Sequence, residues 1–144
     1  MSDFNTFKSE FEIGNIYWFV NPQIPSPEPH PHVCVGKKDD KCVFLFCGTS
    51  QFLKKKRHFE LNNIAFETLV RIEANVTNTI TKETFINCNE VQVHLYSDLY
   101  NNSTFASKGA VSESELFQIR NGIKVSDLME HEIKEEILKV FPEV

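Results

Sequence analysis

The strongest constraint on the fold is a pair of short apolar runs, 32–36 and 41–47, separated by the charged residues Lys37-Lys38-Asp39-Asp40. Runs of this length on either side of a polar turn are typical of two strands joined in a hairpin. The second run contains Val43-Phe44-Leu45-Phe46, where apolar residues occupy both alternating faces. Such a strand needs cover on both sides. We therefore expect a central strand that is buried on both faces.

Strand-like segments fill the first hundred residues, and helical patterns follow. The hydroxyl of Ser112 and the carboxylate of Glu115, three residues later, match a helix-capping box. Apolar residues at helical spacing from 126 to 140 predict a second helix, which Pro142 would stop. The predicted strands are 14–20, 32–36, 41–47, 58–61, 68–74 and 85–95, and the predicted helices are a short segment within 1–12, one from Ser112 to Gly122, and 126–140.

This order of elements predicts an α+β domain. A chain of 144 residues has the usual size of one domain, so we expect 1–144 to form a single unit. Its barrel strands would occupy 12–100, and its helical C-terminal segment 112–140. Strands that precede helices favour a small, strongly curved antiparallel sheet or barrel over alternating α/β units.

Charge is unevenly distributed along the chain. The formal net charge is −5, yet seven basic and two acidic residues give the segment from Lys37 to Arg57 a charge of +5 and leave −10 for the remainder. A basic face on an acidic protein is compatible with a phosphate-bearing ligand, because the local field steers the encounter. A solvated lysine loop is the alternative interpretation.

The chain has no pattern typical of membrane insertion or export. Its longest apolar run, 43–47, is far shorter than a bilayer-spanning helix, and the opening Met1-Ser2-Asp3-Phe4-Asn5 lacks the basic and apolar regions of a signal peptide. We expect a cytoplasmic protein that does not contact membranes.

The four cysteines suggest reduced, mostly buried thiols, because none forms a C-x-x-C pair and no export signal precedes them. A zinc site is the alternative. His30, His32 and Cys34 alternate, so in an extended segment they would share one face and could ligate the metal. The fourth ligand would come from Cys42, Cys47 or Cys88.

Several segments, taken in order, resemble those of a known protein family. The first carries Gly14-Asn15-Ile16-Tyr17-Trp18, and the last is the stretch from Lys108 to Leu116 before the C-terminal helices. Between them lie His30-Pro31-His32-Val33-Cys34-Val35, Cys47-Gly48-Thr49-Ser50-Gln51, His58-Phe59-Glu60-Leu61 and the run from Phe85 to Val93. This ordered set, covering residues 12 to 125, is similar to the MazF/PemK-like toxin family.

The resemblance implies an SH3-like barrel with C-terminal helices. It also implies a homodimeric, metal-independent endoribonuclease that cleaves single-stranded RNA without a cofactor and is held in check by a cognate antitoxin protein. In the family, an arginine before the proline of the second strand acts on the scissile phosphate together with a hydroxyl that ends the next strand. Thr49 or Ser50 matches that hydroxyl, and His30 stands at the arginine position.

The residues themselves can support this chemistry. Cleavage through the 2′-hydroxyl needs a base, an acid and donors to the phosphate, and a histidine such as His30 transfers protons near neutral pH. Thr49 and Ser50 would donate to the phosphate. We expect substrate contacts from the following polar and basic residues: Gln51, Lys54, Lys55, Lys56, Arg57 and His58.

Two other interpretations remain open on the sequence. His30 could be a turn residue in the proline-rich loop 22–31, and Thr49-Ser50 could cap a loop at a strand end. The chain would then be a catalytically inactive SH3-like barrel that binds protein or nucleic acid. Among the aromatic residues that could stack on bases, we expect Phe52 to be exposed and most of the others to be core.

Overall fold

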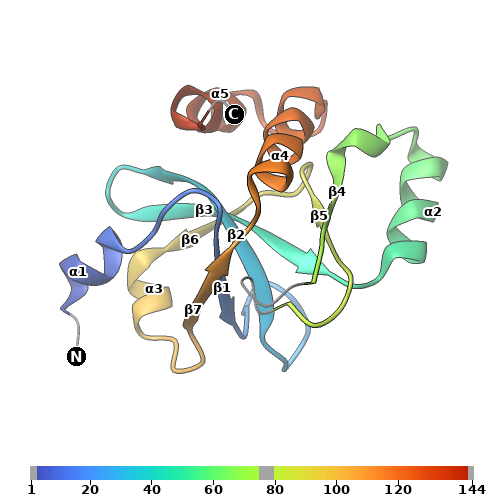
Figure 1. Cartoon of the computed structure of the whole chain (residues 1–144). Coiled ribbons are helices and arrows are strands. Elements are labelled where there is room, and N and C mark those ends of the chain that lie inside the picture. Colours follow the sequence, from blue (N-terminus) through green and yellow to red (C-terminus); the bar gives the residue numbers. More distant parts are fainter. Residues whose placement is uncertain (1–2, 75–79, 143–144) are drawn as a thin grey trace.

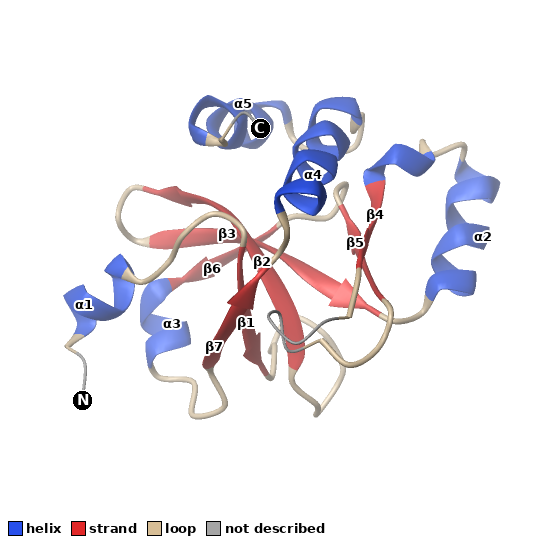
Figure 2. Cartoon of the chain, in the orientation of Figure 1, coloured by secondary structure: helices blue, strands red, loops and turns tan. Residues whose placement is uncertain are grey.

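A computed structural model describes residues 3–74 and 80–142 and has a curled antiparallel sheet with helices packed around it (Figures 1 and 2). The first strands are β1 (Asn15–Phe19), β2 (His30–Lys38) and β3 (Cys42–Thr49). The others are β4 (Leu69–Ile72), β5 (Thr84–Asn87), β6 (Gln92–Leu95) and β7 (Ala106–Ala110). The strand order is β4-β5-β3-β2-β1-β7, and β6 also pairs with β3. The architecture is α+β, with a half-barrel of antiparallel strands.

Strand β3 joins the two halves of this sheet. One of its edges pairs with β2, from His32–Cys47 to Lys38–Cys42. Its other edge pairs first with β6 along Cys42–Leu45 and then with β5 at Gly48 and Thr49. Because one strand serves two neighbours on the same edge, the sheet must bend between them. This bend positions the end of β3 beside β5.

Apolar residues of β3 alternate between two cores, which confirms the prediction of a strand covered on both faces. Phe44 and Phe46 pack with strands β4 and β5 and with the C-terminal helices. Val43 and Leu45 face the opposite side, among aromatic residues of the N-terminal segment. All four side chains are at most 1% exposed. Burial on both sides explains why this segment has no polar face.

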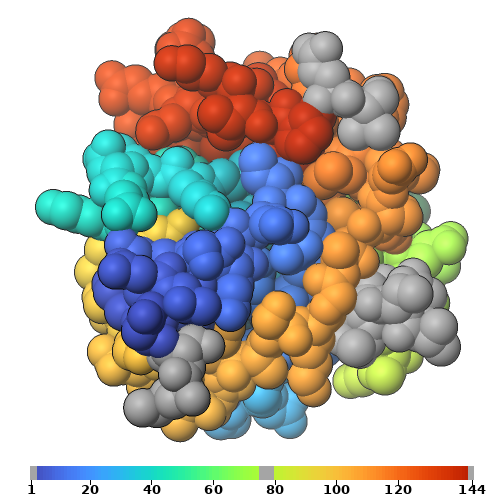
Figure 3. Space-filling model, turned by 60° about the vertical axis from the view of Figure 1, so that its left-hand side comes forward, coloured from blue at the N-terminus to red at the C-terminus, as the bar shows by residue number. Residues whose placement is uncertain are grey.

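Five helices and a 3₁₀ turn are described around the sheet. They are α1 (Phe4–Ser9), α2 (Phe52–Asn62), η1 (Phe66–Thr68), α3 (Tyr96–Tyr100), α4 (Glu113–Val125) and α5 (His131–Val140). Helices α4 and α5 cover one side, with α5 over the β2–β3 hairpin in Figure 3. Helix α1 lies beside α3 and inserts Phe7 into the second core, as the spacing of its aromatic residues predicts. None of the helices in the two described ranges has the length and apolar composition needed to cross a bilayer.

The capping box of α4 is present as predicted. Glu115 donates its backbone N–H to Ser112 Oγ at 3.1 Å, and Ser112 donates its backbone N–H to Glu115 Oε1 at 2.9 Å. The expected end at Gly122 is wrong, because the helix continues to Val125. A Cβ on Gly122 would lie 2.8 Å from Cys88 Sγ, so this glycine permits close packing instead of ending the helix.

Four other sequence predictions are wrong in their details. Residues 58–61 belong to α2 and not to a return strand, and 85–95 forms two strands because Asn87 closes a turn, accepting the Asn89 N–H on Oδ1 at 3.0 Å. The last helix begins at His131, since Ser126 Oγ accepts backbone N–H groups of a preceding turn. Strand β7 lies beyond the predicted strand region 12–100.

Candidate functional site

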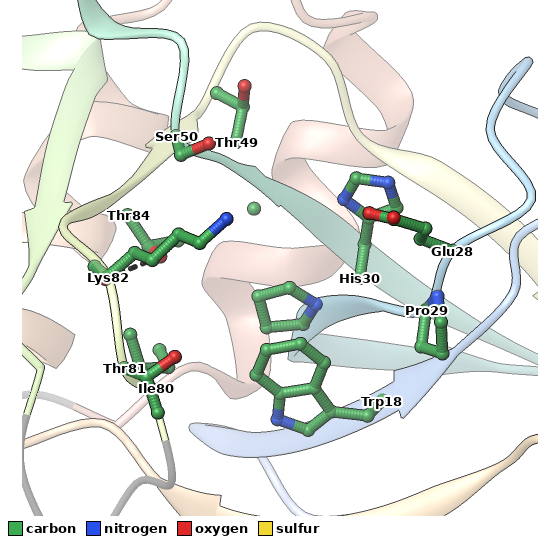
Figure 4. Close-up of a pocket in the computed structure, with 12 residues that line it drawn as sticks. Trp18, Glu28, Pro29, His30, Thr49, Ser50, Ile80, Thr81, Lys82 and Thr84 are labelled. Carbon is green, nitrogen blue, oxygen red and sulfur yellow. Dashed lines mark hydrogen bonds between the residues drawn. The ribbon is translucent and has the colours of Figure 1, made fainter.

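A hollow of about 250 Å³ lies where the end of β3 meets the start of β2, and we call it the central cleft (Figure 4). Its lining residues are Trp18, Glu28, Pro29, His30, Pro31, Gly48, Thr49, Ser50, Ile80, Thr81, Lys82 and Thr84. The last hydrogen-bonded pair of β2 and β3 is His32 with Cys47, and the same register two residues further places His30 opposite Thr49. The structure thus brings the three predicted catalytic residues to one site.

Gly48 lets three strands approach one another at the cleft. A Cβ at this position would lie 2.7 Å from Thr84 Cγ2 and 3.1 Å from the Pro31 carbonyl oxygen. The first contact is shorter than real Cβ atoms make and the second is tighter than most, so glycine allows β2, β3 and β5 to pack this closely. The close approach places residues of β5 next to those of β2.

His30 is half-buried at the end of the proline-rich loop, and its Nε2 lies 3.1 Å from Ser26 Oγ. Within the described ranges, no hydrogen bond of His30 Nδ1 is found. Thr49 Oγ1 accepts the backbone N–H of Gln51 at 3.2 Å, so its own proton can be donated elsewhere. Ser50 is exposed, and Figure 4 shows its oxygen directed toward the middle of the cleft.

Lys82 is a cleft residue that the sequence analysis missed. Its side chain extends from the segment before β5 toward the space between Ser50 and His30 (Figure 4). The Lys82 ammonium has no ion-pair partner among the residues that the structure describes. No local motif marks Lys82, because it follows Thr49 by more than thirty residues and reaches the cleft only through the pairing of β5 with β3. Glu28, also missed, contributes a carboxylate to the same hollow.

The predicted substrate-binding residues divide into two groups. Gln51, Lys54 and Lys55 line a second hollow of about 440 Å³, which shares His30, Gly48, Thr49 and Ser50 with the central cleft. Arg57 and His58 line a neighbouring groove with Leu53 and Leu61, and Lys54 lines both hollows. Lys56 lines none of the hollows described. This separation arises because 52–62 is a helix, and consecutive side chains point to different sides of a helix. The six predicted substrate-binding residues therefore do not all line one hollow.

Most of the aromatic residues that could stack on bases are part of the core, as the sequence predicted. Tyr17, Phe19 and Phe59 are buried, whereas Trp18 is half-buried and lines the central cleft. Phe52, which the sequence predicted to be exposed, is half-buried against Phe85 with ring centroids 4.6 Å apart. Trp18 is therefore the aromatic residue best placed to meet a ligand at the cleft.

The zinc alternative lacks a ligand set in the described part of the chain, where no group of three His, Cys, Asp or Glu residues is arranged to hold a metal ion. Both ring nitrogens of His32 already make hydrogen-bond contacts within the protein. Asn21 Nδ2 donates to His32 Nε2 at 3.0 Å, which leaves the proton on Nδ1, and Nδ1 contacts the Tyr17 carbonyl oxygen at 3.3 Å. Burial lowers the pKa of His32 to about 3, so the ring is neutral and structural.

The thiols do not support nucleophilic chemistry. All four cysteines are free, and three of them are buried, which confirms the prediction of reduced, mostly buried thiols. Burial raises the pKa of Cys34 and of Cys47 to about 11 and raises that of Cys88 further. Thiols with raised pKa values remain protonated at neutral pH and are poor nucleophiles.

A scan of the chain against models of protein families and a search of curated proteins both found no match. The likeness to MazF/PemK toxins therefore rests on the quoted residues alone.

Proposed function

We propose that this chain is a MazF/PemK-like, metal-independent endoribonuclease that cleaves single-stranded RNA in the central cleft. In this proposal the half-barrel is a divergent SH3-like barrel, and the protein acts in the cytoplasm as a homodimer under the control of a cognate antitoxin. The observation that carries the proposal is that one histidine, two hydroxyl-bearing residues and one lysine line one hollow, although they come from distant parts of the chain.

The reaction that fits these groups is an internal transesterification. The 2′-oxygen of one nucleotide loses its proton and attacks the neighbouring phosphorus, and the 5′-oxygen leaves with a proton, giving a 2′,3′-cyclic phosphate and a 5′-hydroxyl. His30 exchanges one of these protons, since imidazole titrates near neutral pH. Glu28, on the same wall of the cleft, is the candidate for the other.

Charge develops on the phosphate oxygens during this attack, and fixed donors stabilise it. The Lys82 ammonium and the Ser50 hydroxyl are candidate donors at the cleft, and Thr49 lines the same hollow with its oxygen directed away from Lys82 in Figure 4. Lys82 supplies the positive charge on which the proposal relies in place of a divalent cation. An arginine at position 30 would bind phosphate through two parallel hydrogen bonds. His30 cannot make this paired contact, but it can transfer a proton near neutral pH.

Incubation of the purified chain with 5′-labelled mixed single-stranded RNA in EDTA tests the proposal. We expect cleavage products with cyclic phosphate ends. His30→Ala should slow cleavage by about 10²- to 10⁴-fold, the usual contribution of a positioned acid–base group. Lys82→Ala should slow it by about 10²- to 10³-fold, like removal of a charge-stabilising donor.

Matched controls lie on α5, outside the lining of the cleft. His131 and Lys139 are exposed, and alanine there removes the same side-chain types without changing the cleft. His131→Ala and Lys139→Ala should therefore cleave like the parent chain. Full activity of His30→Ala, or cleavage that EDTA abolishes, would contradict the proposal.

The inactive binding module remains the second candidate, because His30 contacts Ser26 within its own loop. If the parent chain cleaves no RNA but binds it, and Lys82→Ala weakens that binding while Lys139→Ala does not, the cleft is a binding site without catalysis.

A further inference from the structure

Three hollows lie side by side on one surface. The central cleft shares Trp18, Glu28 and Pro29 with a hollow of about 480 Å³ that also includes Lys108, and we call this the tryptophan hollow. On its other side, the cleft shares His30 and its strand-end neighbours with the hollow of about 440 Å³ lined by Gln51, Lys54 and Lys55. Shared lining residues make the three hollows neighbours, with the cleft in the middle.

Each hollow is lined by at least one lysine: Lys108 at one end, Lys82 in the cleft, and Lys54 and Lys55 at the other end. Cations repeated along a groove follow the phosphates of an extended single strand. Trp18 stands on the wall between the cleft and the tryptophan hollow, where an indole ring can stack on any base.

The third hollow has a different lining. It contains the side-chain amides of Asn87 and Gln92, and we call it the amide hollow. Both amides have their orientation set by protein contacts. Asn87 Oδ1 accepts the backbone N–H of Asn89 at 3.0 Å, which assigns the oxygen and leaves the Asn87 NH₂ group as the remaining polar group.

Gln92 is oriented by a longer chain of contacts. The backbone N–H of Gln23 donates to Asn21 Oδ1 at 2.8 Å, so the other end of the Asn21 amide is its NH₂ group. That group donates to Gln92 Oε1 at 2.6 Å, and His94 Nε2 contacts the same oxygen at 2.9 Å. The Gln92 NH₂ group makes no hydrogen bond with any described residue. The amide hollow is therefore lined by two amide side chains whose NH₂ groups make no hydrogen bond with any described residue.

We propose that the three hollows form one binding track for an extended strand of RNA, in which Trp18 stacks on a base on one side of the reacting phosphate and Asn87 and Gln92 recognise a uracil or guanine on the other. Two donors match a pair of acceptors on one base edge, such as the adjacent O6 and N7 of guanine, or the O2 and O4 of uracil on either side of its N3–H. Adenine has no carbonyl oxygen, and its amino group would meet these donors. This inference deepens the proposed function and rests on it for the identity of the ligand.

The test measures binding separately from cleavage. Hexamers with 2′-O-methyl groups have no hydroxyl that can react, so fluorescence anisotropy in EDTA reports affinity alone. We expect an adenine hexamer with one uracil or guanine at the recognised position to bind about 5- to 100-fold more tightly than all-adenine, the usual discrimination of one good pair of hydrogen bonds. Equal affinity for all hexamers would overturn the proposal.

Two substitutions that each add one negative charge distinguish base recognition from general electrostatic repulsion of the RNA. Gln92→Glu keeps the oxygen that Asn21 and His94 contact and replaces the NH₂ donor with an acceptor, so it should abolish the preference for uracil or guanine. Gln51→Glu places the same charge in the same hollow and should weaken all hexamers alike while retaining the preference. A preference that survives Gln92→Glu would overturn the assignment of the amide hollow.

Trp18→Leu tests the other end of the track. It should weaken all hexamers by about 5- to 150-fold, the usual effect of removing one stacking platform, and leave the base preference unchanged. Circular dichroism and the thermal midpoint of each variant check that the fold is intact. A chain that binds with this preference but cleaves no RNA contradicts the proposed function alone. A chain that cleaves without base preference contradicts the track alone.

Discussion

Gly48 shows how one residue without a side chain determines the shape of the candidate site. It lies between the Pro31 carbonyl of β2 and the Thr84 methyl of β5, and it is fully covered. Its φ is not in the left-handed region, so the requirement for glycine comes from space and not from backbone strain. The distance between β2, which begins at His30, and the start of β5, close to Lys82, therefore depends on this position.

Gly48→Ala should widen this approach and destabilise the protein by about 1–3 kcal/mol, the usual effect of overpacking a tight site. Urea unfolding followed by tryptophan fluorescence measures the loss, because the single Trp18 lines the same cleft. We also expect weaker RNA binding than the parent chain at concentrations where the variant is folded. An unchanged unfolding midpoint would show that the strands can move slightly apart without lowering the free energy of unfolding.

The start of α4 shows how one element is tied to the sheet. Glu115 accepts the Ser112 N–H within its own helix cap and also accepts the backbone N–H of Glu73, just after β4, at 2.7 Å. The Glu115 side chain is nearly buried, with 5% of the residue exposed. A helix-capping residue that also accepts a hydrogen bond from the end of a strand fixes the position of the helix over the sheet.

Ser112→Ala should lower the free energy of unfolding by about 1 kcal/mol, the usual loss for a helix cap. Glu115→Ala should cost more, about 2–3 kcal/mol, because it removes the acceptor of two backbone N–H groups in a nearly buried setting. Ser114→Ala, on the exposed side of the same turn, is the control and should change stability by less than about 0.5 kcal/mol. Chemical denaturation of the three variants checks the order, and a Glu115→Ala loss no larger than that of Ser112→Ala would contradict the link to β4.

Across the whole molecule, a polar network is enclosed within the curled sheet. It connects His32 through Asn21 and Gln92 to His94, and both histidines are at most 4% exposed. Burial, reinforced by electrostatic repulsion from a protonated His94 at low pH, lowers the pKa of His32 to about 3. Burial also lowers the pKa of His94 to about 4, against the opposing effect of Asp98. The folded state therefore holds two neutral imidazoles that the unfolded chain would protonate near pH 6.5.

Acidification should destabilise the protein through these residues. Since their folded pKa values lie below 6.5, their contribution is fully present above that pH and declines as the pH falls toward 4. Each histidine can add up to about 1.4 kcal/mol per pH unit to the slope. Unfolding free energies between pH 7 and 4.5 should fall less steeply for His32→Gln than for the parent chain, whereas exposed His131→Gln should keep the parent slope. Equal slopes for all three would show that the buried imidazoles do not govern the acid response.

Local patterns predicted the elements that depend on neighbouring residues. The β2–β3 hairpin, the two-faced burial of β3 and the cap at Ser112 were recognised because their signals lie within a few residues. Helix α2 and strand β7 were missed. The apolar residues near Phe59 suggested a strand, and β7 consists of small and polar residues that become a strand by pairing with β1.

The sequence by itself determined a curled α+β fold and the presence of His30, Thr49 and Ser50 at two strand ends. Only the tertiary structure decided that Lys82 joins them, that the basic run of α2 divides between two sides, and that Asn87 and Gln92 line one hollow. The physical reason is range. Side-chain alternation and capping act over a few residues. The positions of Lys82, Asn87 and Gln92 at the hollows depend instead on the register of β5 and β6 against β3, which no pattern of neighbouring residues encodes.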